Sequence, residues 1–397
     1  MVTRTYKYLL RPNRTQCELL ESVLSQHRYI YNHALAQRKD TFEQTGQSIS
    51  YVVQSKYFLD LRRSNPDVLG LTNSASVQQT LRKLDKAFTA FFRRLKKGES
   101  QVGYPRFKGS ERFNSIEYRY RDGCILKETE QNRMRLKVQN IGEIRMCYHR
   151  PVPTGAVIKH SVIKRVNNKW YVCLMMDIPD REILNTNKLE VGIDVGIKCV
   201  AATSDGVIYD NPKWLREAQR ELRVKQRILS RRKRGSNRRE KARQEVAKLH
   251  EKIANQRSDY LHKITRELVE QYGFIAIENL SLGFMNKNRH LALSSYDASL
   301  GAFRSYLTYK AEYAGVSLVA VNPSYTSQVC SGCGCLVPKK LSVRTHKCLD
   351  CGLELDRDVN AAVNILTKAR NITLGQSVRD VTWTEFGSSV SREAVAL

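Results

Sequence analysis

The spacing of apolar residues changes several times along the first part of the chain. Residues 3–10 alternate between polar and apolar side chains, which predicts a β-strand. After Arg11 and Pro12, apolar residues recur every three or four positions, as on one face of a helix, and this spacing returns over residues 77–95. Glycines and a proline between residues 97 and 105 predict a loop. The chain therefore begins with a predicted strand and a helical segment.

From about residue 112 to residue 180, short alternating runs replace the helical pattern. Such runs are typical of β-strands, and turn-forming residues separate them; they include 144–148, 157–162 and 170–176. We expect residues 1–10 and 108–187 to form one β domain, which a helical domain at residues 11–107 interrupts. Residues 185–188, Asn-Thr-Asn-Lys, are expected to form a linker.

The second half of the chain predicts a mixed α/β domain. Its expected segments are a strand, turn and strand over 191–206, basic helices over 213–270 with a break near 234–237, a short buried strand at 273–280, a helix at 299–314 and a strand at 316–321. A cysteine-rich segment and a last helix follow. We assign residues 188–325 and 355–371 to this domain, 326–354 to an insertion, and 372–397 to a mobile tail rich in serine, threonine and glycine.

Length and charge narrow the class of protein. A chain of 397 residues, 41% of them hydrophobic, is long enough for two or three folded domains. Lysine and arginine outnumber aspartate and glutamate by 67 to 39, and the net charge of +28 favours nucleic acid as a partner over ribosomal or membrane-surface binding. No apolar run reaches the roughly 18 residues of a membrane span, and the first residues lack a secretory signal. We therefore expect a cytoplasmic protein with no membrane partner.

Four cysteines near the C-terminus have the spacing of a metal site. They form two Cys-x-x-Cys pairs, separated by fourteen residues: Cys330 and Cys333, then Cys348 and Cys351. Four thiolates in this pattern predict a closed structural site for one Zn²⁺, with no open position for catalysis. Cys335 and His346 are further donors beside the pairs and are the weaker choices as ligands. The remaining cysteines are scattered singly, as in a reducing compartment.

Three acidic residues stand where apolar patterns predict strands or a helix start. Asp194 lies within one apolar strand, Glu278 ends another, and Asp358 begins the last helix, with Asp356 as its rival. Each acid alone could be a turn or capping residue. Together, buried carboxylates would repel one another, and hard divalent cations relieve that repulsion. The set predicts a site for two Mg²⁺ or Mn²⁺ ions about 3.5–4 Å apart, which suits phosphodiester hydrolysis.

These motifs resemble a known family. Gly-Ile-Asp194-Val-Gly-Ile-Lys, Ile-Glu278-Asn-Leu and Asp-Arg-Asp358-Val-Asn-Ala-Ala-Val-Asn-Ile are similar to the three parts of a RuvC-type, RNase H-like nuclease domain. The zinc ribbon before the third part resembles that of TnpB, a nuclease encoded by insertion sequences and related to compact type V CRISPR effectors. Further similar segments cover residues 77–92, 103–108 and 325–328.

The resemblance, over roughly residues 3–370, implies a fold and an activity. The fold would be a multidomain α+β protein with an RNase H-like nuclease domain, an inserted zinc ribbon, and an N-terminal wedge β-barrel interrupted by a helical recognition domain. The activity would be RNA-guided cleavage of DNA. A guide RNA from the transposon end would pair with one strand, and the protein would read a short adjacent motif in the double-stranded target. The implied metal ligands are Asp194, Glu278 and Asp358, and we expect a monomer in the RNA complex.

Basic and polar residues elsewhere are candidates for contacts to nucleic acid. Arg231, Arg232, Arg234 and Arg238 lie in a basic run that predicts a channel for the guide or heteroduplex, although a solvated helix face with pairs such as Glu240–Gln244 is the alternative. Arg106 and Lys108 are similar candidates. By resemblance to the family, the residues that read the motif DNA are Tyr51, Ser55 and Gln79.

Three other functions remain open on sequence grounds. A nuclease-inactive RNA-guided repressor would share the charge and the zinc ribbon, and only the three acids argue against it. A DDE-type transposase would use the same two-metal chemistry without needing the zinc ribbon between its second and third acids. A compact CRISPR effector differs from a transposon nuclease only in its genomic context.

Overall fold

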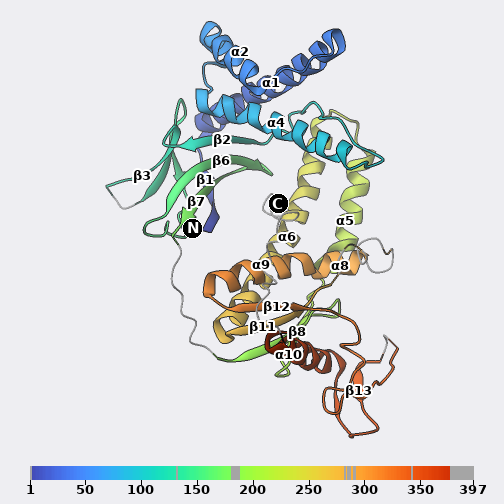
Figure 1. The fold of residues 1–397 in the computed structure, drawn as a ribbon. Helices are drawn as coiled ribbons and strands as arrows, with labels where there is room; N and C mark the ends of the chain where they lie inside the picture. Colours follow the sequence, from blue (N-terminus) through green and yellow to red (C-terminus); the bar gives the residue numbers. More distant parts are fainter. Residues whose placement is uncertain are drawn as a thin grey trace. The chain divides into compact units, whose positions relative to one another are not determined.

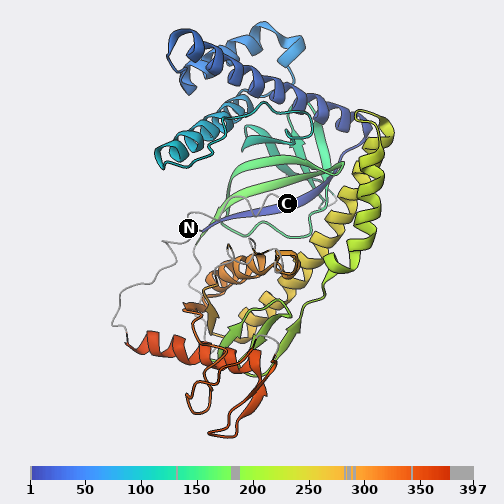
Figure 2. The same ribbon diagram turned by 90° about the vertical axis from the view of Figure 1, so that its right-hand side faces the viewer.

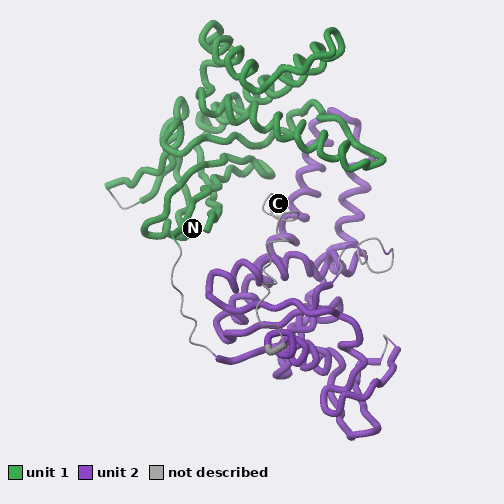
Figure 3. Tube along the Cα trace, in the orientation of Figure 1, with its two compact units in different colours: residues 1–181 green, residues 182–397 purple. Residues whose placement is uncertain are grey.

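A computed structural model describes residues 2–130, 133–179, 188–280, 283, 288, 292–340 and 343–375. The chain forms two compact units, residues 1–181 and 182–397 (Figure 3). Most of the expected linker, residues 185–187, and the tail from residue 376 onward lie outside the described residues.

In the first unit, the strands close into a barrel. These strands are β1 (Val2–Arg11), β2 (Ser115–Tyr120), β3 (Gly123–Glu128), β4 (Met134–Val138), β5 (Gly142–Met146), β6 (Val157–Val166) and β7 (Lys169–Ile178). Their order around the barrel is β1-β5-β4-β3-β2-β6-β7. Strand β1 closes it by pairing with β7 from Val2↔Ile178 to Leu10↔Trp170, and with β5 at Leu10↔Met146. The expectation that the first strand belongs to the later β segment is therefore confirmed.

Helices fill the chain between β1 and β2. They are α1 (Arg14–Thr45), α2 (Tyr51–Ser64), α3 (Pro66–Leu69) and α4 (Ser74–Lys96). Asn13 and Asn73 begin α1 and α4 with side-chain caps that accept from the third helical N–H. Apolar side chains of α1 and α4, such as Leu20 and Leu84, share one buried core with Tyr8 and Ile116 of the barrel. Helices and barrel therefore fold as a single hydrophobic unit (Figure 1).

The second unit is built on a mixed sheet. Its order is β10-β9-β8-β11-β12, from strands β8 (Glu190–Asp194), β9 (Cys199–Thr203), β10 (Ile208–Asp210), β11 (Phe274–Glu278) and β12 (Ser317–Val321). Strands β8, β11 and β12 run parallel, whereas β9 is antiparallel to β8. The helices are α5 (Trp214–Arg231), α6 (Asn237–Gln271), α8 (Ala292–Ala298), α9 (Leu300–Ala314) and α10 (Arg357–Gly375). Helices α5 and α6 form an antiparallel pair (Figure 2).

Helices cover both faces of this sheet. Helices α6 and α9 pack on one face, where Leu268 and Phe303 join Val191 and Ile275 in a buried core. Helix α10 packs on the opposite face, where Ile365 lies against Ala276 (Figure 1). Strands β13 (Thr345–Lys347) and β14 (Glu354–Asp356) form a small hairpin just before α10. Helix α10 ends at Gly375, so residues 372–375 are helical and the helix continues beyond its expected end at 371.

Close packing of α10 on β8 depends on a glycine. A Cβ atom at Gly192 would lie 2.0 Å from the carbonyl oxygen of Ala362 and 2.8 Å from the backbone nitrogen of Leu366. No larger side chain fits there unless the helix moves. None of the described helices carries an apolar stretch long enough for a membrane crossing.

Substitution of Gly192 tests this packing. We expect Gly192→Ala to destabilise the second unit by about 3 kcal/mol, because backbone atoms of α10 cannot yield to the added methyl group. Chemical denaturation measures the change. Gly109→Ala is the control, since a Cβ there meets no atom within 4 Å, and its cost should stay within about 0.5 kcal/mol. Equal stability of the two variants would contradict the close approach.

Candidate carboxylate site and cysteine cluster

Asp194 and Glu278 end neighbouring parallel strands at the same level. The register pairs Gly192 with Ala276 and Ile193 with Ile277, so the two acids follow at matching positions. Side chains alternate between the faces of a strand, and residues two apart share a face. Because Gly192 and Ala276 face α10, Asp194 and Glu278 point to that face as well.

Asp358 reaches the same place from the helix. It lies in the first turn of α10, one turn before Ala362, the residue that rests on Gly192. The thiol of Cys199, the first residue of β9, donates to its Oδ2 atom over 3.5 Å. Strand and helix packing thus bring Asp358 to the sheet edge where Asp194 and Glu278 end.

The ionisation of these acids reflects their closeness. Burial, together with the negative charges of Glu278 and Asp358, raises the pKa of Asp194 to about 8, against the lowering effect of Arg357. Burial also raises the pKa of Glu278, while the hydrogen bond from the Thr326 hydroxyl lowers it. Because Glu278 and Asp358 both hinder the ionisation of Asp194, a bound cation would be stabilised at this site.

The thiol beside the acids stays protonated. Burial and the negative charge of Asp358 together raise the pKa of Cys199 to about 12. A protonated thiol is a poor ligand for a metal, because the thiolate is the coordinating form. The donor set is therefore hard oxygen, the set that Mg²⁺ and Mn²⁺ prefer.

Two arginines that we did not predict lie beside Asp358. Arg357 donates to its Oδ1 atom from Nη2 at 2.9 Å and from Nε at 3.1 Å, and Arg344 Nη1 lies 3.7 Å from Oδ2. Arg357 directly precedes Asp358 in the Asp-Arg-Asp sequence, so its place beside this acid could have been predicted. Arg344 comes from the cysteine-rich segment, fourteen residues away, and nothing local marks it. The rival acid, Asp356, accepts the backbone N–H of Asp358 at 2.8 Å and so helps to cap α10.

Two buried asparagines fasten α10 to the cysteine-rich segment. Asn360 donates to the carbonyl of Val329 at 2.9 Å and accepts the N–H of Ser331 at 3.0 Å. Asn364, one turn on, donates to the carbonyls of Thr326 and Val329 at 2.8 and 2.7 Å. The hydroxyl of Thr326 in turn donates to Glu278. One hydrogen-bonded chain therefore links the first cysteine turn, the helix of Asp358 and the carboxylate of Glu278.

The four predicted cysteines converge. Their sulfur atoms all lie within 4.8 Å of one another, with Cys330 and Cys351 at 3.6 Å and Cys333 and Cys348 at 3.6 Å. Tetrahedral sulfurs on zinc bonds of about 2.3 Å would stand about 3.8 Å apart, so the set fits zinc. Among the described residues, no other group of three or more Cys, His, Asp or Glu side chains is this compact, and the three carboxylates are spaced more widely.

The two Cys-x-x-Cys turns have the same local structure. In each, the glycine after the second cysteine donates its N–H to the carbonyl of the first over 3.0 Å, Gly334 to Cys330 and Gly352 to Cys348. Both glycines have positive φ, 80° and 74°, a conformation that other residues adopt at a cost. The repeated Cys-x-x-Cys-Gly pattern thus shapes two matching halves of one metal site.

Other donors near the cluster are placed differently. Cys335 is exposed, and its carbonyl accepts the N–H of Cys330 at 2.9 Å. His346 is fully buried in the small hairpin, and its Nδ1 atom is hydrogen-bonded to the ammonium group of Lys339. Neither belongs to the compact group of four.

The basic candidates of the second unit gather at one turn. Arg231 ends α5, Arg232 and Arg234 lie in the turn, and Arg238 lies in the first turn of α6; all four are exposed. Nearby Arg239 instead donates to the carbonyls of Leu229 and Arg232 and stabilises the turn. The alternative pair Glu240–Gln244 also forms, at 3.1 Å.

The candidates of the first unit lie on its helices and on the loop after α4. Tyr51 begins α2, and its hydroxyl accepts from Arg82 of α4 at 3.3 Å. Ser55 and Gln79 are buried, on α2 and α4. In the loop, Arg106 is exposed, while the backbone of Lys108 is held by the Asn32 side chain at 2.8 and 3.0 Å.

The chain is similar over most of its length to proteins with assigned names. It is 32% identical over 369 residues to a Streptomyces pristinaespiralis protein named "Putative RNA-guided DNA endonuclease", covering 92% of this chain and 89% of that protein. It is 30% identical over 382 residues to the Escherichia coli K12 protein "Putative RNA-guided DNA endonuclease InsQ", covering 91% of each.

Family descriptions match three parts of the chain. Residues 173–289 match "Probable transposase", residues 301–365 match "Cas12f1-like, TNB domain", and residues 1–47 match "Helix-turn-helix domain". Within residues 2–47, the structure forms strand β1 and one long helix, α1.

Solved structures share the fold. A Cas12f1–sgRNA–target DNA complex has a TM-score of 0.54 at 16% identity, covering 89% of this chain and 83% of the other. The mini-RNA-guided endonuclease CRISPR-Cas_phi3 has a TM-score of 0.54 at 9% identity, covering 95% and 93%. The fold is thus the mixed α/β, multidomain fold of these effectors. The identity to the Streptomyces protein, over nearly the whole chain, shows that this chain belongs to the TnpB family.

Removal of one cysteine tests the role of the metal cluster. We expect Cys348→Ser to lose bound zinc and endonuclease activity together, because the cluster is tied through Asn360 and Asn364 to the helix of Asp358. Elemental analysis of the purified protein gives the zinc content. Cys335→Ser is the matched control and should keep zinc. Activity that survives the loss of zinc would show that the cluster does not brace the site.

Proposed function

We propose that this protein is an RNA-guided DNA endonuclease that cuts target DNA beside a short motif. The observation that carries the proposal is the meeting of Asp194, Glu278 and Asp358 at one edge of the sheet, on a chain of net charge +28. The names of the relatives support guidance by RNA and DNA as the substrate.

Asp194, Glu278 and Asp358 would hold the divalent cations. A pair of Mg²⁺ ions at such a site activates a water molecule and stabilises the leaving oxygen of a phosphodiester. The carboxylates supply the hard oxygen ligands, and Thr326 orients Glu278 through its hydroxyl. Arg357 and Arg344 keep positive charge beside Asp358, so the acids do not repel an approaching phosphate chain.

The remaining parts take roles in recognition under this proposal. The barrel, from residues 1–10 and 108–187, acts as the wedge domain, and residues 11–107 form the recognition domain. Residues 188–325 and 355–371 form the RuvC-like, RNase H-like nuclease domain, with the zinc ribbon at 326–354. The exposed arginines of the turn between α5 and α6 suit the phosphates of a guide RNA or heteroduplex.

The acids separate this function from its rivals. A nuclease-inactive repressor has no use for a buried Asp194 whose pKa is raised by two neighbouring carboxylates, Glu278 and Asp358. A DDE-type transposase would share the metal chemistry but would join DNA strands, and strand-transfer products would reveal it.

Replacement of one carboxylate tests the chemistry. With guide RNA and a matching target, Asp194→Asn should lower the cleavage rate at least about a thousandfold, because a metal ligand is lost while the basic surface is unchanged. RNA and target binding, measured by filter retention, should remain within about twofold, since phosphate contacts supply that affinity.

Asp259→Asn is the control for that variant. Asp259 is exposed on α6 and pairs with Lys263, and it belongs to neither the carboxylate site nor the cysteine cluster, so cutting should continue at the normal rate. Full cleavage by Asp194→Asn would refute the assignment of this site.

Substitutions on α2 test motif reading. Tyr51→Phe and Ser55→Ala should change the preferred adjacent motif, because they remove hydroxyl groups that could bond base edges. Cleavage of DNA that is already open beside the target should persist. Selection from a randomised motif library measures the preference, and Val53→Ala, an exposed position on the same helix, should leave it as it was. Unchanged preference in both hydroxyl variants would refute their role.

A further inference from the structure

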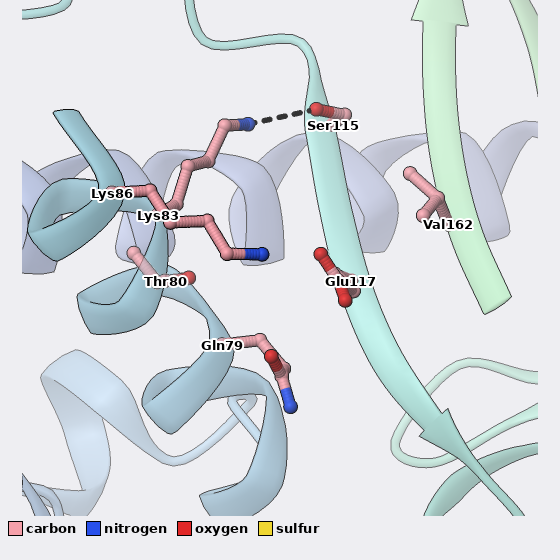
Figure 4. A pocket seen from close by; sticks show the side chains of 7 residues that line it. All are labelled: Gln79, Thr80, Lys83, Lys86, Ser115, Glu117 and Val162. Carbon is pink, nitrogen blue, oxygen red and sulfur yellow. Dashed lines mark hydrogen bonds between the residues drawn. The ribbon is translucent and has the colours of Figure 1, made fainter. Parts of the chain in front are cut away.

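One lysine of the cysteine-rich segment has an unusual partner. Lysine side chains in the described part of the chain usually donate to oxygen atoms. In the cavity between α4 and β2, for example, Lys83 donates to the hydroxyl of Ser115 (Figure 4). Lys339 is instead hydrogen-bonded to Nδ1 of His346, the middle residue of strand β13. This contact joins a cation to a histidine in the small hairpin that carries part of the cysteine cluster.

The contact determines which ring nitrogen of His346 carries the proton. An ammonium group has three donors and no acceptor, so Lys339 donates and Nδ1 accepts. A neutral imidazole that accepts at Nδ1 carries its proton on Nε2. The hydrogen bond therefore assigns the Nε2–H tautomer to His346, and this second donor is directed away from Lys339.

The Nε2–H group lacks a partner among the residues that the structure describes. His346 is fully buried, and its Nε2 atom makes no hydrogen bond to any of them. A buried donor without an acceptor destabilises the folded state, and native proteins rarely leave one unpaired. The metal-loaded cluster next to the hairpin supplies the acceptors that this donor needs, because zinc holds cysteine as thiolate.

Strand geometry places the imidazole on the side of the cluster. Pairing in the hairpin joins His346 to Leu355 and continues past it, because the backbone N–H of Cys348 donates to the carbonyl of Leu353 at 2.9 Å. Residues two apart on an extended segment project to the same face. The side chains of His346 and Cys348 therefore share one face of the hairpin.

Two of the four cysteines lie on the buried side of the cluster. Cys330 and Cys348 are buried, while Cys333 and Cys351 are exposed. Burial raises the pKa of the Cys330 thiol, whereas a backbone hydrogen bond and the side chain of His346 lower it, with a lowered pKa as the net result. Cys330 is therefore the sulfur on which His346 acts.

Lys339 adds a positive charge on the same side. Burial and the charge of Arg357 lower the pKa of Lys339, whereas Cys330 and Cys348 raise it. Its ammonium group is thus within electrostatic reach of two sulfur atoms. Four thiolates around one Zn²⁺ carry a net negative charge, which a nearby cation offsets. The imidazole between the cation and the sulfur polarises in the direction that strengthens both hydrogen bonds.

We propose that Lys339 and His346 stabilise the zinc-bound cluster without coordinating the metal, through a hydrogen bond from Nε2–H of His346 to the thiolate of Cys330. Lys339 fixes the tautomer that makes this donor available. The hydrogen bond holds the sulfur in place and disperses part of its charge, so the site retains zinc more strongly. This assignment concerns the metal site alone and does not depend on the proposed function.

Zinc affinity tests the proposal. The zinc-loaded protein competes for the metal with a chelator that changes colour on binding zinc. His346→Phe keeps a ring of similar size but no N–H, and it should weaken zinc affinity between about 10-fold and 100-fold. His346→Gln keeps an N–H donor near the position of Nε2 and should recover most of the lost affinity.

Lys339→Met shows whether the lysine acts through the histidine. It should weaken zinc affinity less than His346→Phe does, and its effect should shrink when His346→Phe is already present, as for coupled residues. Lys340→Met is the matched control, since Lys340 is an exposed lysine next along the chain, and zinc affinity should stay as in the wild type.

The tautomer of His346 gives a reading that a packing role alone would not produce. In protein with isotope-labelled histidine, long-range proton–nitrogen correlation spectra distinguish the two ring nitrogens. The signals missing from His346→Gln are those of His346. The zinc-loaded wild type should show a proton on Nε2 and none on Nδ1. Circular dichroism at saturating zinc checks that each variant is folded.

The outcomes are distinct. A proton on Nδ1, or direct coordination of the metal by Nε2, would overturn the proposal, as would equal zinc affinity in the wild type and His346→Phe. If the wild type binds no zinc, this proposal fails together with the metal cluster, while the test of Asp194 still decides the proposed function. If His346→Phe does not fold, the wild-type tautomer and the affinity of Lys339→Met decide.

Discussion

The candidate site depends on how closely α10 can approach the central sheet. Gly192 and Ala276 lie side by side on β8 and β11, and their small size lets the backbone of α10 rest almost directly on the strands. Two residues further along each strand, on the same face, stand Asp194 and Glu278. One turn before the contact residue of the helix stands Asp358. A single packing contact therefore sets the spacing of all three carboxylates, and a larger residue at position 192 would move one of them away.

The cysteine cluster supports the same helix from its N-terminal end. The four cysteine sulfur atoms lie together and so hold two turns of the chain against each other. Asn360 and Asn364 of α10 are hydrogen-bonded to the first of these turns. Through Thr326 the same segment contacts Glu278. A structural metal would stabilise this otherwise small hairpin, because a short segment with little core gains its folding free energy from metal binding. The placement of Asp358 thus rests on sheet packing on one side and on the cluster on the other.

Local chemistry made some of these features predictable. The cysteine pairs and the three acids stand out because they interrupt apolar patterns or repeat at fixed spacing, and the structure brings the cysteines together. The strand at residues 3–10 was predictable from its alternation, but its partner was not. It pairs with residues 170–178 and closes the barrel. Arg344 and Asn364 were missed, because their roles depend on partners that neither a periodic pattern nor nearby residues reveal. The catalytic role of the acids stays a prediction.

The most direct test is to locate divalent ions at the carboxylates. Crystals of the protein soaked in Mn²⁺ would be measured at the manganese absorption edge, so that anomalous scattering marks each ion. The account predicts manganese bound by oxygen atoms of Asp194, Glu278 and Asp358. Ordered carboxylates that carry no ion at saturating Mn²⁺ would contradict it.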